Sequence, residues 1–370
     1  MKIGLIGLNR TGKTTLFELL SGRNTGAGRS ESKNASSSAA DKNTANIGVG
    51  QVPDERIDFL SAMYKPKKTT YAKIDLTDVA GFTASDSSGH SGASKFLNDV
   101  RTCDALVHVL RAFESESVVH DLETIDPARD LEAVETEMLF ADLEMLEKRI
   151  ARIKAGKKIS KEQTDEVALL ERCFNRLEEG GAIHDMALSE EESEIIRGYA
   201  LLTEKPRLAV INMDEQQWKS GVFPNQDKFS KFCSGLNIPV IMLCVEMELE
   251  ISRLQEEDKK LFMEDMGIEQ PGIAVLAMAV YRLLGLISFL TVGEDEVRAW
   301  PIEKGLTAKK AAGKIHSDIE RGFIRAEVVK YDSIKELGSM VKVKEQGLFR
   351  LEGKEYTVAD GDIINFRFNV

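Results

Sequence analysis

Short apolar runs recur along the chain between longer segments of mixed polarity. The runs that predict β-strands are, in chain order, Ile3–Ile6, Tyr71–Leu76, the ALVHVL stretch at 105–110, Arg207–Ile211 and Pro239–Leu243. Runs of this length are typical of strands buried on both faces, whereas longer periodic segments indicate helices. The fold class predicted from this pattern is α/β.

A helical hairpin is predicted in the middle of the chain. Leu139, Leu143, Leu146, Ile150 and Ile153 follow one another at spacings of 4, 3, 4 and 3 residues, which is the seam of a helix that packs on one partner. A matching stripe follows the next polar stretch at Val167, Leu170, Phe174 and Leu177. We therefore expect two antiparallel helices, followed by a shorter helical segment at Ser189–Leu202.

One long stretch carries neither pattern. Residues Arg23–Asn46 are small and polar, with almost no large apolar side chain. Such a composition buries too little apolar surface to offset the entropy of ordering the chain. We expect a loop that is disordered in the absence of ligand.

Composition restricts the class of protein. The 370 residues are 42% hydrophobic and 30% charged, which is typical of a globular protein large enough for two or three domains. No apolar run reaches the ~18 residues of a membrane span, and the first strand leaves no room for a signal peptide. The four cysteines lack metal-site spacing. We expect a cytoplasmic protein that has no membrane partner.

The charge is unevenly distributed along the chain. A net charge of −12 argues against nonspecific adhesion to nucleic acid. Yet Glu147–Gln163, at the expected hairpin tip, holds seven Lys or Arg against two Glu, and the residues after Ile287 carry 14 acidic and 14 basic side chains. The tip is either a solvated turn or a surface that contacts RNA.

The first apolar run leads directly into a phosphate-binding loop. Residues Gly7–Thr14 read GLNRTGKT, a complete G-x-x-x-x-G-K-[S/T] pattern between a strand and a helix. In such a loop the backbone N–H groups surround the phosphates, the Lys side chain reaches the β- and γ-phosphates, and the following hydroxyl binds Mg²⁺. The expected nucleotide contacts are Asn9, Arg10, Thr11, Gly12, Lys13, Thr14 and Thr15, with Lys13 also catalytic and Thr14 also a metal ligand.

A second nucleotide motif lies about sixty residues further along the chain. The strand at Tyr71–Leu76 is followed by DVAG, from Asp78 to Gly81. In nucleotide-switch proteins a D-x-x-G at this place puts the Asp in the Mg²⁺ shell, and the Gly N–H detects the γ-phosphate. We expect Asp78 to act at the metal and Gly81 to contact the nucleotide.

The base is expected to lie beside NMDE, from Asn212 to Glu215. Guanine-binding proteins carry N-K-x-D there, and the Asp accepts hydrogen bonds from guanine. Here Met213 replaces the Lys and Glu215 replaces the Asp, while Asn212 can still reach the N7/N6 edge of adenine. Losing a matched polar set costs several kcal/mol of discrimination, so ATP is favoured. Leu243 and Cys244 are expected to pack backbone amides against the base.

In these motifs the chain resembles the YchF/Obg-like ATPase family of P-loop proteins over nearly its whole length. The motifs that carry the resemblance include NIGVGQVPDER, YKPKK, DVAG, SKFLNDVR, HVLRAFE, NMDE, VRAWPIEKG and AAGKIHSDIERGFIRAEV. The resemblance implies a P-loop nucleotide-binding domain at 1–123 and 206–286, an inserted helical coiled-coil domain at 124–205, and a β-grasp TGS domain at 287–370. It also implies a preference for ATP over GTP and association with the ribosome.

The chain departs from that family in its phosphate loop and in both switches. The family loop reads GLPNVGKS, so Asn9, Arg10 and Thr11 occupy variable slots. The family places a Thr on Mg²⁺ in the first switch, where this chain has Lys42; either Thr44 replaces that ligand or the ligand is missing. The second switch, GFTASDSSGHSGAS, has lost some glycines. These changes indicate a divergent paralogue.

Catalysis needs a group other than the residue that follows DVAG. Phe82 occupies the place of the water-orienting Gln of Ras-like proteins, and a phenyl ring cannot orient water. Lys13, Mg²⁺ and the backbone remain, together with two histidines. His108 is either catalytic or a core histidine, and His90 is either catalytic or a solvated loop residue.

The predicted function is a nucleotide-dependent switch, expected to be monomeric, that binds and slowly hydrolyses ATP. Its expected partner is the ribosome or ribosomal RNA, contacted through the basic hairpin and the TGS domain. One alternative is an adenine-nucleotide sensor that does not hydrolyse ATP, and another is a GTPase.

Overall fold

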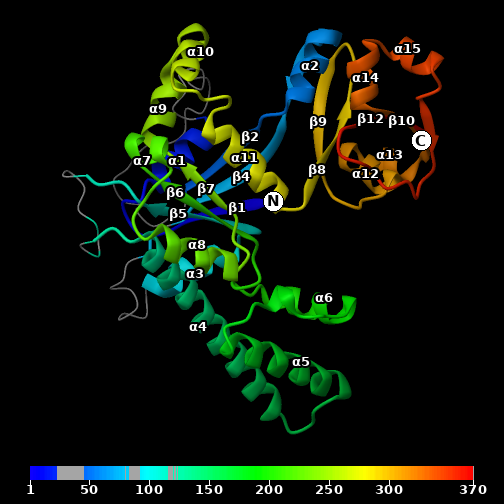
Figure 1. Ribbon diagram of the computed structural model, residues 1–370. Helices are drawn as coiled ribbons and strands as arrows, with labels where there is room; N and C mark the ends of the chain where they lie inside the picture. Colours follow the sequence, from blue (N-terminus) through cyan, green and yellow to red (C-terminus); the bar gives the residue numbers. More distant parts are fainter. Residues whose placement is uncertain are drawn as a thin grey trace, which may run out of the picture. The chain divides into compact units, whose positions relative to one another are not determined.

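The computed structural model describes residues 1–22, 46–79, 81–82, 92–115, 120, 122 and 124–369. The chain divides into two compact units. The first comprises Met1–Gly48 and Asp75–Gly272, and the second comprises Val49–Ile74 and Ile273–Val370. The structure contains two six-stranded sheets, and Figure 1 labels most of their strands and colours them by sequence position.

The first sheet has the strand order β2-β4-β1-β5-β6-β7. Its strands are β1 (Lys2–Ile6), β2 (Asn46–Val52), β4 (Ala72–Asp78), β5 (Ala105–Arg111), β6 (Arg207–Asn212) and β7 (Val240–Leu243). The neighbours from β4 to β7 pair in parallel. Every residue of β5 and β6 is buried, which explains why these central strands appear in the sequence as nearly continuous apolar runs. Ligands bind such sheets at the carboxyl ends of the strands.

All five predicted strands are present in this sheet. The boundaries differ most at β4, which begins one residue later and ends two residues later than the predicted run, at Asp78. Strand β2 was not predicted because only its alternate residues, Gly48, Gly50 and Val52, are buried. Glycines contribute no apolar signal to a sequence pattern, so an edge strand of this composition is hard to recognise.

Helices of the first unit pack against the sheet or against one another, and two apolar clusters join some of them to the sheet. They are α1 (Lys13–Leu20), α3 (Gly92–Arg101), α7 (Glu215–Ser220), α8 (Gln226–Gly235), α9 (Val245–Arg253) and α10 (Glu256–Asp265). Helix α4 (Pro127–Lys154) contributes Val134 and Met138 to one cluster and Ala128 and Leu131 to the other. The N-terminal half of α4 is therefore part of the core of the first unit.

The predicted helical hairpin is formed by α4 and α5 (Lys161–Glu178), followed by the short 3-10 helix η3 (Ile183–Asp185) and α6 (Glu190–Tyr199). Figure 1 shows α4, α5 and α6. Both α5 and α6 begin with a capping box, at Ser160 and Ser189, which satisfies their first backbone N–H groups. The two predicted stripes meet in one cluster with α6. The heptad-like spacing therefore identified the correct packing surface.

Two buried carboxylates connect α4 to the rest of the first unit. Asp142 accepts hydrogen bonds from the backbone N and the hydroxyl of Thr203 at 2.8 and 2.9 Å, and it pairs with Arg101 of α3 at 3.5 Å. Glu135 pairs with Arg207 at the start of β6. Because unpaired buried charges are very costly, these contacts tie α4 to α3 and to the sheet.

The second unit contains a mixed sheet with the strand order β11-β10-β12-β8-β9-β3. Its strands are β3 (Lys68–Thr70), β8 (Leu286–Thr291), β9 (Glu296–Glu303), β10 (Phe323–Lys330), β11 (Arg350–Glu352) and β12 (Asp362–Phe368). Its helices are α2 (Glu55–Tyr64), α11 (Gly272–Leu283, all but its first residue), α12 (Ala308–Ile315), α13 (Ser317–Arg321), α14 (Tyr331–Leu337) and α15 (Met340–Glu345).

The core of this second sheet lies beneath α12. Phe289 stacks on Trp300 with ring centroids 6.1 Å apart and meets the edge of Phe366 at 5.7 Å, while alanines of α12 pack on the same cluster. The parallel pair β12/β8 lies between antiparallel neighbours, as in a β-grasp sheet. Small alanine side chains allow the helix to approach the aromatic layer closely.

Compactness groups residues 49–74 with the C-terminal unit, whereas the sequence analysis placed them in the nucleotide-binding domain. Strand β3 pairs in parallel with β9, with Thr69 opposite Val297. Arg56 forms ion pairs with Asp54 at 2.8 Å and with Asp360 at 3.0 Å. The pairings with β9 and with Asp360 join residues more than two hundred positions apart, so no local pattern reveals them. Among the described residues, no helix combines the length and the apolar character needed to cross a membrane.

Candidate nucleotide-binding site

The phosphate loop joins the carboxyl end of β1 to α1 and depends on two glycines. Gly7 has φ 139° and Gly12 has φ 96°, both in the region that favours glycine. A Cβ atom at Gly7 would lie 2.4 Å from the carbonyl oxygen of Val109, and one at Gly12 would lie 2.4 Å from Nδ2 of Asn212. The loop therefore fits closely against β5 and β6, with the N-terminus of α1 facing the expected phosphates.

Arg10 is the residue in this loop with an unusual backbone for its type. Its φ is 60°, which costs a side-chain-bearing residue roughly 1 kcal/mol or more. The neighbouring Thr11 is buried and donates a hydrogen bond from its hydroxyl to the carbonyl oxygen of Leu8 at 3.2 Å. The loop is thus held in one conformation by contacts within it.

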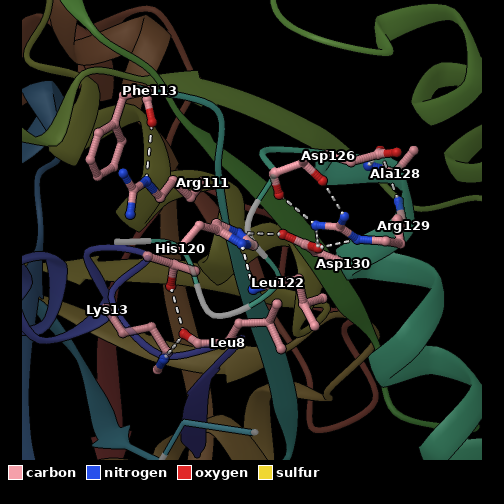
Figure 2. Close-up of polar contacts among 12 residues, drawn as sticks. Leu8, Lys13, Arg111, Phe113, His120, Leu122, Asp126, Ala128, Arg129 and Asp130 are labelled. Carbon is pink, nitrogen blue, oxygen red and sulfur yellow. Dashed lines mark hydrogen bonds and ion pairs between the residues drawn. The ribbon is translucent and has the colours of Figure 1, made fainter. Parts of the chain in front are cut away.

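The predicted cation and metal ligands lie at the start of α1. Nζ of Lys13 donates to the carbonyl oxygen of Gly7 at 3.1 Å and also to that of Leu8, and Figure 2 shows the latter contact. The hydroxyl of Thr14 donates to Oδ2 of Asp78 at 3.1 Å. The fold therefore brings together Thr14 and Asp78, which are 64 positions apart, as the motif spacing predicts. Thr15 is half-buried on the next position of the helix.

Gly81 lies directly against the phosphate loop. A Cβ atom at Gly81 would lie 2.0 Å from Oδ1 of Asn9 and 3.1 Å from Nζ of Lys13. No side chain other than hydrogen fits this position, because the neighbouring amide already fills the space. Gly81, Asn9 and Lys13 therefore converge at one point, where the sequence places the end of the phosphate chain.

Phe82 turns away from that point. Its backbone N donates to the carbonyl oxygen of Gly7 at 3.1 Å, while its ring is buried and lies 5.6 Å from the ring of Phe96 on α3. The ring belongs to the apolar cluster that also contains Met138 of α4. The side chain that follows DVAG therefore serves packing, and water orientation must come from another group.

His108 lies beneath the phosphate loop on β5, opposite Ile6 of β1. Its side chain is buried, and neither ring nitrogen has a hydrogen-bond partner among the described residues. Burial, with the nearby charges of Lys13 and Arg207, lowers the pKa of His108 to about 3. A neutral imidazole of this pKa is a poor general base at neutral pH. This setting fits the core-histidine alternative.

Arg111 ends β5 and is a site residue that sequence reasoning did not single out. Its Nε donates to the carbonyl oxygen of Phe113 at 3.1 Å, and its guanidinium lies 4.5 Å from the centre of the Phe113 ring (Figure 2). Burial and the charge of Arg10 lower the pKa of Arg111. Arg10, Lys13 and Arg111 together make this end of the sheet electropositive, which suits a polyphosphate.

At the base end, Asn212 connects two loops. Its Nδ2 donates to the carbonyl oxygen of Thr11 at 3.0 Å, and its Oδ1 accepts from the backbone N of Val245 at 3.1 Å. The side chain is 4% exposed. The sequence analysis assigned this amide to the edge of the base, whereas in the structure its oxygen and one of its N–H groups bond the backbone of the phosphate loop and of α9.

The other base-end residues differ in exposure. Met213 is buried among apolar side chains, and its backbone N donates to the carbonyl oxygen of Leu243 at 2.8 Å. Glu215 begins α7 and forms an ion pair with Lys219 at 2.6 Å. Leu243 and Cys244 are buried where β7 leads into α9, and burial raises the pKa of the Cys244 thiol. Glu215 is therefore the exposed carboxylate at this end.

Sequence reasoning also missed the histidine at the entrance to α4. Nε2 of His120 lies 3.0 Å from Oδ2 of Asp130, and its Nδ1 accepts from the backbone N of Leu122 at 3.1 Å, as Figure 2 shows. Arg129 forms an ion pair with the same Asp130 at 2.8 Å. In the sequence, the buried pair of His120 and Asp130 is indicated only by the two valines that precede His120.

Three predicted positions cannot be located in the fold. Lys42 and Thr44 of the first switch, together with the rest of the predicted disordered loop up to residue 45, lie outside the described residues, and so does His90 of the second switch. The alternatives stated for these positions stay predictions.

Two protein-family models match the chain. One, described as a 50S ribosome-binding GTPase, matches residues 2–141. The other, YchF-GTPase_C, is described as a protein of unknown function and matches residues 286–369. The first match covers the phosphate loop and DVAG, and the second covers most of the mixed sheet.

Curated relatives match over the full length. The chain is 40% identical to the ribosome-binding ATPase YchF of Bacillus subtilis, with 99% of each chain covered. It is 37% identical to the protein of the same name from Escherichia coli O157:H7, covering 100% of this chain and 99% of the relative. The solved structure of the Schizosaccharomyces pombe YchF GTPase superposes with a TM-score of 0.84 at 29% identity, covering 99% of this chain and 97% of that one.

Proposed function

This chain belongs to the YchF family, and on that premise we propose that it is a nucleotide-dependent switch that binds and slowly hydrolyses ATP and associates with the ribosome. The observation that carries this proposal is the convergence of Lys13, Thr14 and Asp78 at the carboxyl end of β1. These groups supply one cation for the phosphates and two oxygen ligands for a metal ion, which are recurring parts of a P-loop hydrolase.

Mg²⁺ is the proposed cofactor, held by Thr14 and Asp78. A hydroxyl and a carboxylate oxygen 3.1 Å apart suit a hard cation that also keeps water and phosphate oxygens as ligands. Among the described residues no group of three or more His, Cys, Asp or Glu side chains is placed to hold a metal. This pattern fits a metal ion that arrives with the nucleotide. When bound, Mg²⁺ neutralises charge that develops on the phosphates.

ATP is the proposed nucleotide, with GTP bound more weakly. Met213 occupies the core and presents no donor, and Glu215 is longer than the Asp that reads guanine. Both curated relatives are named ATPases. Adenine offers an acceptor at N1 where guanine offers a donor, so a carboxylate aimed at this edge opposes ATP only if it cannot move away. Glu215 is 58% exposed and has that freedom.

A physical connection links the nucleotide to the helical hairpin. Gly81 lies against the phosphate loop, and the next residue, Phe82, packs with Phe96 of α3 and Met138 of α4. A movement of Gly81 towards a γ-phosphate would displace the adjoining ring within a close-packed cluster. We infer that the occupancy of the site alters the position of α4 and of the hairpin tip.

The hairpin tip and the TGS domain are the proposed ribosome contacts. Lys157, Lys158 and Lys161 are exposed at the tip, and no ion pair of theirs occurs among the described residues. Lys154, by contrast, pairs with Glu171 at 2.6 Å. The proposed domain division is 1–123 with 206–286 for the nucleotide, 124–205 for the hairpin and 287–370 for TGS, and residues 49–74 are grouped with the C-terminal unit. We propose that the protein is a monomer and that it acts in the cytoplasm, where it can reach ribosomes.

Calorimetry followed by a turnover assay tests the nucleotide function. We expect Mg·ATP to bind more tightly than GTP, and phosphate release to be slow and altered by added ribosomes. Binding without any release, with or without ribosomes, would support the sensor alternative. GTP binding that is tenfold tighter than ATP binding would support the GTPase alternative.

Charge reversal at the hairpin tip tests the ribosome contact. Lys157→Glu, Lys158→Glu and Lys161→Glu together should weaken co-sedimentation with ribosomes and flatten its salt dependence by about 0.7 of a log–log unit for each phosphate that the tip no longer binds. ATP affinity should not change. The matched control is Lys231→Glu with Lys259→Glu and Lys260→Glu, on α8 and α10. If the two triple variants co-sediment equally with ribosomes, the tip is a solvated turn that does not contact them.

A further inference from the structure

Asn9 of the phosphate loop lies in close contact with Gly81. Its Oδ1 lies only 2.0 Å, and its Cγ 2.9 Å, from the point where a Cβ atom of Gly81 would stand. Nζ of Lys13 lies 3.1 Å from the same point. The carboxamide therefore touches the second switch on one side and borders the lysine that reaches the β- and γ-phosphates on the other.

The amide of Asn9 is not engaged in holding the loop together. No hydrogen bond of its side chain occurs among the described residues, and the side chain is half-buried. Asn212, at the end of β6, is the opposite case, because its amide bonds the backbone at both ends. A half-buried amide without a structural partner, in a site built for an anion, is available for a ligand.

A polar side chain at position 9 can supply a group that the reaction requires. Hydrolysis of a phosphoanhydride by a P-loop protein requires a group that orients the attacking water. Phe82 is committed to the apolar cluster, and His108 is enclosed and neutral. A carboxamide donates through nitrogen and accepts through oxygen, as the Gln of Ras-like proteins does. A half-turn about the Cβ–Cγ bond exchanges the two atoms, so either can face the water.

We propose that Asn9 is a catalytic residue whose carboxamide contacts the terminal phosphate and the attacking water of bound ATP. The water oxygen forms a bond to the γ-phosphorus as the bond from that phosphorus to the β–γ bridging oxygen breaks. ADP leaves with the electron pair, and the proton of the water passes to a phosphate oxygen. Asn9 orients the water through hydrogen bonds and takes no proton. The inference rests on the proposed ATPase function and deepens it.

Single-turnover hydrolysis by Asn9→Ala tests this assignment. We expect turnover to fall by about tenfold or more, the cost of losing one well-placed amide in a catalytic site. The affinities for Mg·ATP and Mg·ADP should stay within about threefold of the parent values, because the backbone N–H groups and Lys13 still bind the phosphates. A residue that only supports the loop would weaken both affinities instead.

Two further variants complete the experiment. Asn9→Gln keeps the amide and should recover part of the lost turnover, whereas Asn9→Ser should not. Asn175→Ala removes an amide on α5, outside the nucleotide site, and should hydrolyse ATP at the parent rate. Unchanged or faster turnover in Asn9→Ala overturns the proposal. Absence of turnover in the parent itself, with or without ribosomes, would instead overturn the ATPase function on which it rests.

Discussion

The phosphate end and the base end of the nucleotide site are built in different ways. At the phosphate end, two glycines with positive φ, a lysine and a hydroxyl–carboxylate pair present polar groups to one point. At the base end, Met213 and Leu243 are buried in the core. The phosphates of ATP and GTP are identical and need the same contacts, whereas the base is selected by a few polar groups. The phosphate end therefore tolerates little change, and the base end can be altered without losing the ligand.

Asn212 belongs to both ends. Its amide joins the phosphate loop to the start of α9 through Thr11 and Val245. Asn212 therefore braces the loops that surround the nucleotide, and its contact with the base stays a prediction. The contrast between the ends predicts that changes near the phosphates affect all nucleotides, while changes near the base alter selectivity.

The largest effect is expected at Lys13. Lys13→Ala removes the cation aimed at the β/γ-phosphates and should lower the affinity for Mg·ATP at least about 100-fold, ~2.7 kcal/mol. ATP and GTP should be affected alike, and circular dichroism should show an intact fold. Calorimetry measures the change, and an affinity within about threefold of the parent would contradict the assignment of the loop.

Asn212 comes next. Asn212→Ala leaves the carbonyl oxygen of Thr11 and the N–H of Val245 without their partner, and the free energy of unfolding should fall by about 2 kcal/mol. Urea denaturation measures this loss. Because the phosphate loop loosens, ATP and GTP should both bind more weakly by the same factor. A change in the ATP-to-GTP ratio at constant stability would instead support the predicted contact of Asn212 with the base.

The pH dependence of stability reports on His108. The unfolded imidazole binds a proton below about pH 6.5, whereas the folded one does so only near pH 3, so the unfolded state gains stability as pH falls through this window. Relative to His108→Gln, the parent should lose about 1 kcal/mol more between pH 7 and pH 5.5. Parallel stability curves for the two proteins would show that His108 is solvated in solution.

The smallest effect is expected at the base end. Met213→Lys with Glu215→Asp recreates the guanine-reading pair and should shift preference toward GTP by about tenfold, ~1.4 kcal/mol. Because Met213 is buried, the double variant should also have a lower melting temperature. Glu215→Asp alone leaves the core intact and serves as the control. Competition binding measures the ratio of the affinities for ATP and GTP. An unchanged ratio in both variants would show that the base binds elsewhere.

Several features were predictable because their signals are local. The strand–loop–helix order around Gly7–Thr14 is written in consecutive residues, and the structure places β1 and α1 on either side of it. The hairpin seam depends on spacings of three and four residues, which determine one helix face whatever surrounds it. The meeting of Thr14 with Asp78 could also be anticipated, because adjacent parallel strands end at the same edge of the sheet.

The amino-acid sequence by itself determined the phosphate loop, the parallel strands and the hairpin, since backbone conformation and periodicity act within a few residues. The tertiary structure alone decided that β3 pairs with the C-terminal sheet, that the imidazole of His108 is enclosed, that Asn212 braces two loops, and that Asn9 lies against Gly81. Each depends on the close packing of segments distant in the chain, where displacements of a few ångströms change the partner of a polar atom.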